Sequence, residues 1–303
     1  MMTQRRISRR ECLARSTAVA GGVLAGSPGV TQLSVAQAAG RERLSFAIVS
    51  DTHIGYRGRD SARLQWQKTA DELATLDVSF LLHLGDVVDG GQVELYPVYR
   101  EIRERISRSV HEIPGNHDPA DGFARYIRRP IDTVVDHGWL RCILLNNAHR
   151  DSHDGFFTEE QLGWLARQLE ATKRDGRLAI IGCHVPVHAN RHPDRGWYVK
   201  PESGQQRFYE LVSAHRDELI GVFHGHFHNG IRGWDDRAPL HEICFPSALY
   251  NQNRGLEEKQ APGFNPIEFR PGYTVATLDE GHLSLRYCPT GAEASVGVRL
   301  RHV

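Results

Sequence analysis

The sequence predicts a layered α/β sandwich in a single domain. Short apolar runs rich in β-branched residues recur along the chain, and amphipathic helical patterns lie between the earlier runs. Strands that alternate with helices and are followed by several late strands are typical of sheets covered by helices. The composition, with 40% hydrophobic and 24% charged residues among 303, is that of a globular chain long enough to bury a core. It excludes a disordered, collagen-like or coiled-coil protein.

The predicted strands are runs of roughly four to eight apolar residues, a length typical of buried strands. Each run ends in a polar loop. The runs cover residues 44–49, 78–84, 110–113, 140–145, 178–181, 220–223, 240–245, 273–278 and 283–287.

Apolar residues at helical spacing predict helices between the early strands. Leu64, Ala70 and Leu73 define one helix over residues 61–76, and a second pattern with one charged face covers residues 95–106. The charged face is expected to be a solvated helix surface.

The segment Thr158-Glu159-Glu160-Gln161 has the form of a capping box, which predicts that a helix begins there and continues past Leu169. A further helix is expected over residues 208–214. The segment 250–272 is long, polar and rich in Gly and Pro, and it is expected to form either a functional lid or a disordered loop.

The first 38 residues have the character of an export signal. They hold five arginines and one acid, then a short apolar run and the small residues Ala36 and Ala38. The pair Arg9-Arg10 resembles the twin-arginine export signal of bacteria, although Cys12 stands where an aromatic is usual. We expect the twin-arginine machinery to export the chain, with cleavage after Ala38 and a periplasmic or secreted product. A disordered basic tail with a short helix is the alternative.

The expected mature chain, residues 39–303, has few features of a nucleic-acid or membrane protein. Loss of the basic leader leaves a mildly acidic chain, which argues against a nucleic acid polymer as partner. The apolar run in the leader is too short and glycine-rich for a membrane span, and none is expected after cleavage. Four cysteines remain and are expected to be buried thiols, although an oxidising compartment permits a disulfide: Cys142, Cys183, Cys244 and Cys288.

Side chains of the kinds that bind metals follow five of the predicted strands. Because the carboxyl ends of parallel strands meet at one edge of a sheet, these loops are expected to converge on one crevice. In chain order they supply Asp51 and His53, Asp86 and Asp89, Asn116, His117 and Asp118, His184, and finally His226 and His228.

The spacing and residue types within these loops indicate a dinuclear metal site. Two residues separated by one in an irregular loop can both face one ion, as in Asp51-x-His53, and the preceding glycines let the backbone approach closely. A mixture of imidazole, carboxylate and amide ligands suits transition ions better than Ca²⁺ or Mg²⁺. Seven candidate ligands are too many for one ion but fit two ions if one carboxylate bridges them. Such a pair of ions is a common device for displacement at phosphorus.

Taken together, Asp51-x-His53, Gly85-Asp86, Gly115-Asn116-His117-Asp118, His184 and Gly225-His226-x-His228 resemble the signature of the calcineurin-like metallophosphoesterases. The resemblance spans residues 46–228, and the tail from Tyr273 fits the closing strands of that fold. It implies a four-layer αββα sandwich with two transition-metal ions, Mn, Fe or Zn, between its sheets.

The resemblance also implies a role for each residue. One ion would be held by Asp51, His53, Asp86 and His228. The other would be held by Asp86, Asn116, His184 and His226, with Asp86 and a hydroxide bridging the pair. His117 would face the substrate as an acid or electrostatic clamp, while Asp89 and Asp118 are candidates for orienting the site.

Departures from the wider family narrow the expected activity. Gly90-Gly91 stands where protein Ser/Thr phosphatases carry an arginine, and no block supplies the tyrosine ligand of purple acid phosphatases. The motifs look most like those of bacterial cyclic-nucleotide-type (class III) phosphodiesterases. We therefore expect a metal-dependent phosphoric ester hydrolase acting on small phosphodiesters, with cyclic nucleotides among the possibilities. The alternatives are a phosphomonoesterase for phosphate scavenging and, more remotely, a non-catalytic metal-holding binding protein.

Several other polar residues near these motifs leave more than one interpretation open. His83 and His224 are expected to be structural, and His188 to be either a surface residue or a substrate contact. Asn146-Asn147 is expected to form a turn and Trp197-Tyr198 to pack in a loop or stack on a base. The weaker candidates for a phosphate contact are Arg150, His153, His192 and Arg195.

Overall fold

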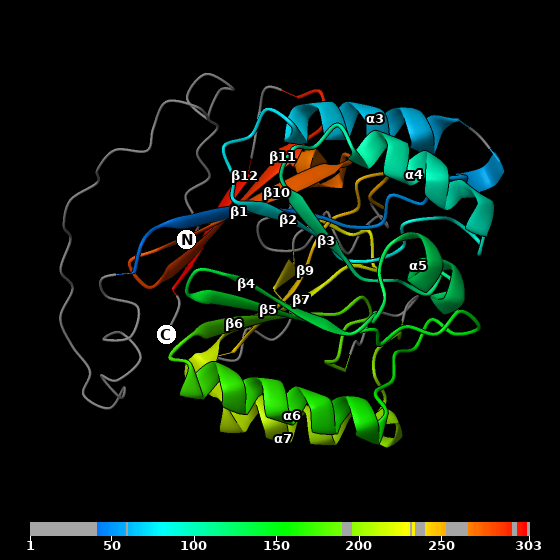
Figure 1. The fold of residues 1–303 in the computed structure, drawn as a ribbon. Coiled ribbons are helices and arrows are strands. Elements are labelled where there is room, and N and C mark those ends of the chain that lie inside the picture. The colour runs from blue at the N-terminus through cyan, green and yellow to red at the C-terminus, as the bar shows by residue number, and fades with distance from the viewer. Residues whose placement is uncertain are drawn as a thin grey trace.

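The computed structural model describes residues 41–58, 60–189, 196–230, 232–233, 240–252, 266–292 and 296–301. These residues form two mixed six-stranded sheets that pack face to face, with helices on both outer faces (Figure 1). The expected export signal, His192, Arg195 and most of the 250–272 segment lie outside the described residues, so the predictions made for them stay predictions.

The first sheet has the strand order β12-β11-β10-β1-β2-β3. Its central strand β1 pairs in parallel with β2, which pairs in parallel with β3, while the late strands add an antiparallel meander on the other side of β1. The bounds are β1 Leu44–Val49, β2 Phe80–His83, β3 Ser109–Glu112, β10 Gly272–Asp279, β11 His282–Pro289 and β12 Val296–Arg301.

The second sheet has the order β4-β5-β6-β7-β9-β8, with β5, β6, β7 and β9 parallel and the two edge strands antiparallel. The bounds are β4 Thr133–His137, β5 Leu140–Leu144, β6 Leu178–Gly182, β7 Leu219–His224, β8 Arg232–Gly233 and β9 His241–Cys244.

Strand β1 shows how the sequence alternation builds the layers. Phe46 and Ile48 point into the core between the two sheets, whereas Ala47 and Val49 point toward the helices on the outer face. This is the period of two that a strand imposes on its side chains. Because both faces are covered, both sets are apolar, which explains why the run reads as continuously hydrophobic.

Helices form the two outer layers of the sandwich. Helices α3 (Ser61–Leu73) and α4 (Tyr96–Arg103) cover the first sheet, and α6 (Glu159–Arg174) and α7 (Gln205–Ala214) cover the second (Figure 1). The short helix α5 (Ala120–Tyr126) follows β3. The structure thus confirms the predicted single-domain α/β sandwich and its four layers.

The predicted helix over 61–76 forms, but one of the residues that predicted it does not face the core. Leu64 is 47% exposed, whereas Ala70 and Leu73 are buried as expected, and Trp66 also lies on the buried face of α3. Trp66 stacks on Tyr99 of α4 with ring centroids 5.5 Å apart, which joins the two helices of this layer.

The capping box predicted for the third helix is confirmed. The Thr158 side chain accepts a hydrogen bond from the backbone N–H of Gln161, and the Gln161 side chain accepts one from the backbone N–H of Thr158. Such caps fix where a helix begins, because they satisfy N–H groups that have no partner inside the helix.

All nine predicted strands are present, with ends that shift by one or two residues. The elements not predicted are β4, β8, β12 and α5. Strand β4 is an edge strand whose residues are only partly buried and include Asp136 and His137, so its sequence lacks an apolar run. The four cysteines are buried thiols, as expected. No helix among the described residues is long and apolar enough to cross a membrane.

Candidate metal centre

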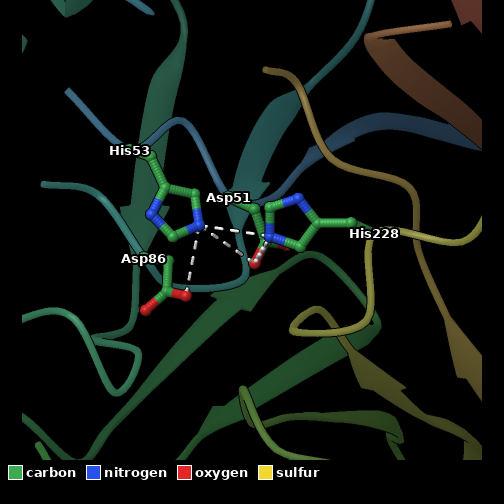
Figure 2. A group of neighbouring side chains, drawn as sticks. All are labelled: Asp51, His53, Asp86 and His228. Atoms are coloured by element: carbon green, nitrogen blue, oxygen red, sulfur yellow. Dashed lines mark hydrogen bonds and ion pairs between the residues drawn. The ribbon is translucent and has the colours of Figure 1, made fainter. Parts of the chain in front are cut away.

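The five predicted loops meet where the two sheets face each other. Asp51, His53, Asp86 and His228 are buried, and their ligand atoms lie within 4.8 Å of one another (Figure 2). A second buried group, whose ligand atoms also lie within 4.8 Å of one another, contains His184, His226 and again Asp86. The structure therefore brings the predicted ligands together as two groups that share one carboxylate.

In the first group, the Nε2 atoms of His53 and His228 lie 3.1 Å apart. The His53 Nε2 atom is 3.4 Å from Asp86 Oδ2, and the His228 Nε2 atom is 3.1 Å from Asp51 Oδ1. The dashed lines in Figure 2 show how both rings and both carboxylates point toward one small volume.

The other ring nitrogens fix which atoms can bind a cation. His228 Nδ1 lies 3.0 Å from the backbone oxygen of Tyr250, and His53 Nδ1 lies 3.0 Å from Asp89 Oδ1. Since a carbonyl or carboxylate oxygen only accepts, both Nδ1 atoms carry the proton and both Nε2 atoms present a lone pair. Two facing lone pairs beside two carboxylates repel one another unless a cation lies among them, so these residues fit a metal ion.

The second group has the same arrangement around His184. Its Nδ1 atom donates a hydrogen bond to the backbone oxygen of Leu84 at 2.7 Å, which leaves Nε2 as the ring nitrogen that faces the group. That Nε2 atom is 3.2 Å from Asp86 Oδ2 and 3.2 Å from His226 Nδ1. This donor set likewise fits a cation.

Asp86 is placed so that one of its oxygens serves both groups. Its Oδ1 atom accepts a hydrogen bond from the backbone N–H of His117 at 2.8 Å, while Oδ2 faces both His53 and His184. The neighbouring Asn116 is buried, and its side-chain oxygen has no hydrogen-bond partner among the described residues. An unsatisfied buried oxygen is costly, and a cation beside it would remove that cost.

The backbone is strained at the candidate ligands. Only seven non-glycine residues of the described chain have a positive φ, and five of them belong to the two groups: Asp51, His53, Asp86, His226 and His228. Side chains other than glycine avoid this conformation, and it persists where the surrounding structure enforces it, often at functional sites.

The protonation states of several candidate ligands in the two groups suit metal binding. Burial alone would raise the pKa of Asp51. The nearby His228 has the opposite and stronger effect, so the pKa of Asp51 falls well below its usual range. Burial lowers the pKa of both His226 and His228, which stay neutral. His184 differs, because Asp86 outweighs burial and raises its pKa to about 9. A bound cation would displace that proton.

His117 and Asp89 lie at the edge of the centre. Asp89 Oδ1 is 3.0 Å from His53 Nδ1 and 3.1 Å from His117 Nδ1, and the backbone N–H of Gly90 also lies 3.1 Å from that His117 nitrogen, so Asp89 and its neighbour orient the two rings. Burial lowers the pKa of His117, but the hydrogen bond to Asp89 raises it more, and the pKa reaches about 9. The His117 Nε2 atom has no hydrogen-bond partner among the described residues and is the ring nitrogen left for a ligand.

Asp118 lies behind the centre rather than in it. Its two oxygens accept hydrogen bonds from the backbone N–H groups of Val87, Val88 and Gly115 and from the hydroxyl of Tyr96. It thereby joins the loop that carries Asp86 to the loop that carries Asn116. This contact pattern is consistent with the orienting role expected for it.

Glu242 is a buried positioning residue that the sequence analysis missed. Its Oε1 atom accepts hydrogen bonds from the backbone N–H groups of Val187 and His188 and from the rings of His188 and His224. It ties the loop after His184 to the strand before His226. Four donors surround this oxygen, so the Glu242 carboxylate is satisfied without a cation, although the cluster contains metal-type ligands.

The contacts of Glu242 decide two of the open interpretations. His224 is structural, as expected. His188 is buried against Glu242, so the expectation of a surface residue is wrong, and the substrate contact stays a prediction. Asn147 also does more than form a turn, since its side chain makes two hydrogen bonds to the backbone of Val185 and so holds the His184 loop.

An open cavity of about 650 Å³ adjoins the centre. Asn116 and His117 lie on its wall near the candidate ligands, and Arg150, His153 and Trp197 line other parts of it. Trp197 stacks on His153 with centroids 4.1 Å apart, which favours the loop-packing interpretation of that tryptophan. The volume lies within the roughly 300–1,000 Å³ typical of small-molecule sites.

Comparison with known proteins identifies the class to which this arrangement belongs. The family profile described as calcineurin-like phosphoesterase matches residues 44–230, and the chain belongs to that family. It is a metal-dependent phosphoric ester hydrolase, with its candidate ligands in the two-group arrangement described above.

Curated relatives with different substrates in their names match the chain at similar identity. A probable glycerophosphodiester phosphodiesterase of Arcobacter nitrofigilis is 25% identical over 59% of this chain and 70% of its own length. A 3',5'-cyclic adenosine monophosphate phosphodiesterase of Pseudomonas aeruginosa is 23% identical over 78% of this chain and 86% of its own. A probable cyclic nucleotide phosphodiesterase of Rhodococcus erythropolis is 27% identical over 82% and 84%.

Solved structures support the fold at lower identity. A dimetal phosphatase from Danio rerio has a TM-score of 0.61 at 14% identity and covers 86% of this chain and 99% of its own. A purple acid phosphatase from yellow lupin has a TM-score of 0.62 at 13% identity, over 86% of this chain and 54% of its own.

The close approach of the loops generates a prediction at Gly225. A Cβ atom there would collide with the Ser50 hydroxyl and lie 2.8 Å from Asp51 Oδ2. We expect Gly225→Ala to displace Asp51 and to lower the metal content of the purified protein by at least about tenfold. The measurement is elemental analysis after gel filtration, with circular dichroism to confirm folding.

Gly163→Ala is the matched control, because a Cβ there meets only the end of the Arg167 side chain at 3.7 Å. It lies inside α6 and should raise the free energy of unfolding by up to about 1 kcal/mol with unchanged metal content. Equal metal contents in the two variants would show that the glycine before the ligand loop is not needed for the site.

Proposed function

We propose that this protein hydrolyses small phosphodiesters at a dinuclear metal centre. The observation that carries the proposal is the shared position of Asp86 Oδ2, which lies 3.4 Å from His53 Nε2 and 3.2 Å from His184 Nε2. One carboxylate oxygen facing two separate donor groups is what two neighbouring ions require. Two ions held close together suit displacement at phosphorus.

In this proposal the two donor groups each hold one ion. The first ion takes Asp51, His53, Asp86 and His228, and the second takes Asp86, Asn116, His184 and His226. Imidazole, carboxylate and amide ligands together favour Mn, Fe or Zn over Ca²⁺ and Mg²⁺. When bound, the ions supply charge neutralisation for the phosphoryl group and activation of water.

His117 is proposed to deliver a proton to the departing ester oxygen. Asp89 holds its Nδ1 side, so that Nε2 is the ring nitrogen available on the cavity wall. Asp89 and Asp118 act as positioning residues, the first on the two rings and the second on the two loops. Positioned proton donors typically contribute about 10²–10⁴-fold to a rate.

A phosphodiester is favoured over a monoester by the names of the curated relatives, which are phosphodiesterases for glycerophosphodiesters or cyclic nucleotides. The cavity of about 650 Å³ is large enough for an ester with organic groups on both sides. The pattern of residues 1–38 supports the further proposal that the enzyme is exported and acts in the periplasm or outside the cell.

The substrate class is tested with matched nitrophenyl esters. Purified enzyme loaded separately with Mn²⁺, Fe²⁺ and Zn²⁺ is assayed on bis-nitrophenyl phosphate and nitrophenyl phosphate, and on glycerophosphodiesters and cyclic nucleotides. We expect a higher kcat/KM on the diester than on the monoester. The reverse order would favour the phosphate-scavenging alternative, and no turnover of any of these esters with any of the metals would refute a phosphoester hydrolase.

The role of His117 is tested by the leaving group. His117→Asn should lower kcat by about 10²–10⁴-fold on a diester with an alkyl leaving group. The loss should be smaller on a nitrophenyl diester, because nitrophenolate needs little protonation. Both metals should be retained. An equal loss on the two substrates would demote His117 to a positioning residue, and loss of metal would make it a ligand.

A further inference from the structure

The loop after β5 brings an arginine onto the segment beside the metal centre. The Arg150 guanidinium packs directly on Gly91, where a Cβ atom would collide with it, and its Nη2 atom donates to the backbone oxygen of Gly90 at 3.4 Å. Gly91 has a φ of +77°. The glycine pair thus both turns the chain after Asp89 and leaves room for the guanidinium.

No carboxylate in the part of the chain that the structure describes forms an ion pair with this arginine. None of the ion pairs among the described residues includes Arg150, whereas the buried Arg141 pairs with both Asp136 and Asp175. Arg150 lines the cavity with Asp151 and Asp154, but Asp154 is engaged by Lys200 at 3.2 Å and Asp151 makes no ion pair with it. Its positive charge therefore faces the cavity with most of its donors available.

The guanidinium is connected to the candidate centre through His117. The backbone N–H of Gly91 donates to the backbone oxygen of His117 at 3.0 Å, so Arg150 packs on the segment that is joined to that histidine. Arg150, Asn116 and His117 line the same cavity. A ligand group held beside Asn116 and His117 thus has a cation on the neighbouring wall.

We propose that Arg150 is a substrate-binding residue that takes the non-ester oxygens of the phosphoryl group. The inference rests on the proposed function and extends it to a residue outside the metal-ligand motifs. A guanidinium presents parallel N–H donors that match two oxygens of a phosphate. Because the non-ester oxygens carry more negative charge in a monoester or in inorganic phosphate than in a diester, its contribution is smallest for the diester.

The test compares Arg150→Ala and Arg150→Lys in the metal-loaded enzyme. For Arg150→Ala we expect the inhibition constant of inorganic phosphate to rise about tenfold or more, the size expected for lost charge-assisted hydrogen bonds. The KM for bis-nitrophenyl phosphate should rise less, and metal content should stay at the wild-type value. Arg150→Lys keeps the charge without the planar fork and should recover part of the phosphate affinity.

Arg207→Ala is the matched control, because it removes an exposed arginine that pairs with Glu210 on α7, away from the cavity. It should leave both constants unchanged. Wild-type phosphate inhibition and KM in Arg150→Ala would overturn the inference, as would full recovery by lysine, which would reduce Arg150 to a point charge.

Failure of the proposed function is distinguishable from failure of this inference. If the wild-type enzyme turns over no phosphoester, the proposed function fails, and binding of inorganic phosphate to the metal-loaded protein is then measured by calorimetry. A phosphate affinity that falls in Arg150→Ala but not in Arg207→Ala supports the anion site independently. Equal affinities in wild type and both variants refute it.

Discussion

The placement of one carboxylate, that of Asp86, is the constraint on which the rest of the site depends. Its Oδ1 atom is held by the backbone N–H of His117, and this leaves Oδ2 between His53 of one donor group and His184 of the other. The two histidines come from different sheets. The carboxylate therefore contacts side chains that follow strands of both sheets. A shift of one sheet relative to the other would change the geometry of both donor groups.

Holding Asp86 there requires unfavourable local structure that the packed fold must stabilise. Its φ is positive, as are those of four other candidate ligands, and each such residue costs of order 1–3 kcal/mol. Asp118 fastens the Asp86 loop to the Asn116 loop through backbone hydrogen bonds, and Glu242 fastens the His184 loop to β7. Bound cations would add to these contacts by relieving the repulsion among facing lone pairs and carboxylates.

The strands and candidate ligands could be predicted from the sequence because their signals are local. Residues 44–49 read as a buried strand, and Asp51 and His53 follow within a few positions, so one short segment contains both pieces of information. Strand β4 could not be predicted, because an edge strand such as Thr133–His137 needs no apolar run. In α3 the helical spacing correctly predicted that Ala70 and Leu73 are buried, but it wrongly included Leu64, which is exposed.

The supporting residues were missed because their partners are distant in the chain. Glu242 lies 55 residues from Val187 and Asn147 lies 38 residues from Val185, and no local pattern links them. His188 follows His184 by four residues and was expected near substrate or on the surface, but it points back to Glu242. Arg150 was only one weak candidate among several, and its packing on Gly91 distinguishes it.

We propose that Asp86 is a ligand of both ions. The most direct test compares the number of metal ions bound per chain in Asp86→Ala and in His228→Ala. Both variants are purified with the wild type and analysed for bound metal per chain, with circular dichroism to confirm folding. We expect two ions in the wild type, loss of both in Asp86→Ala, and loss of mainly one in His228→Ala. Two tightly bound ions in Asp86→Ala would contradict the shared carboxylate.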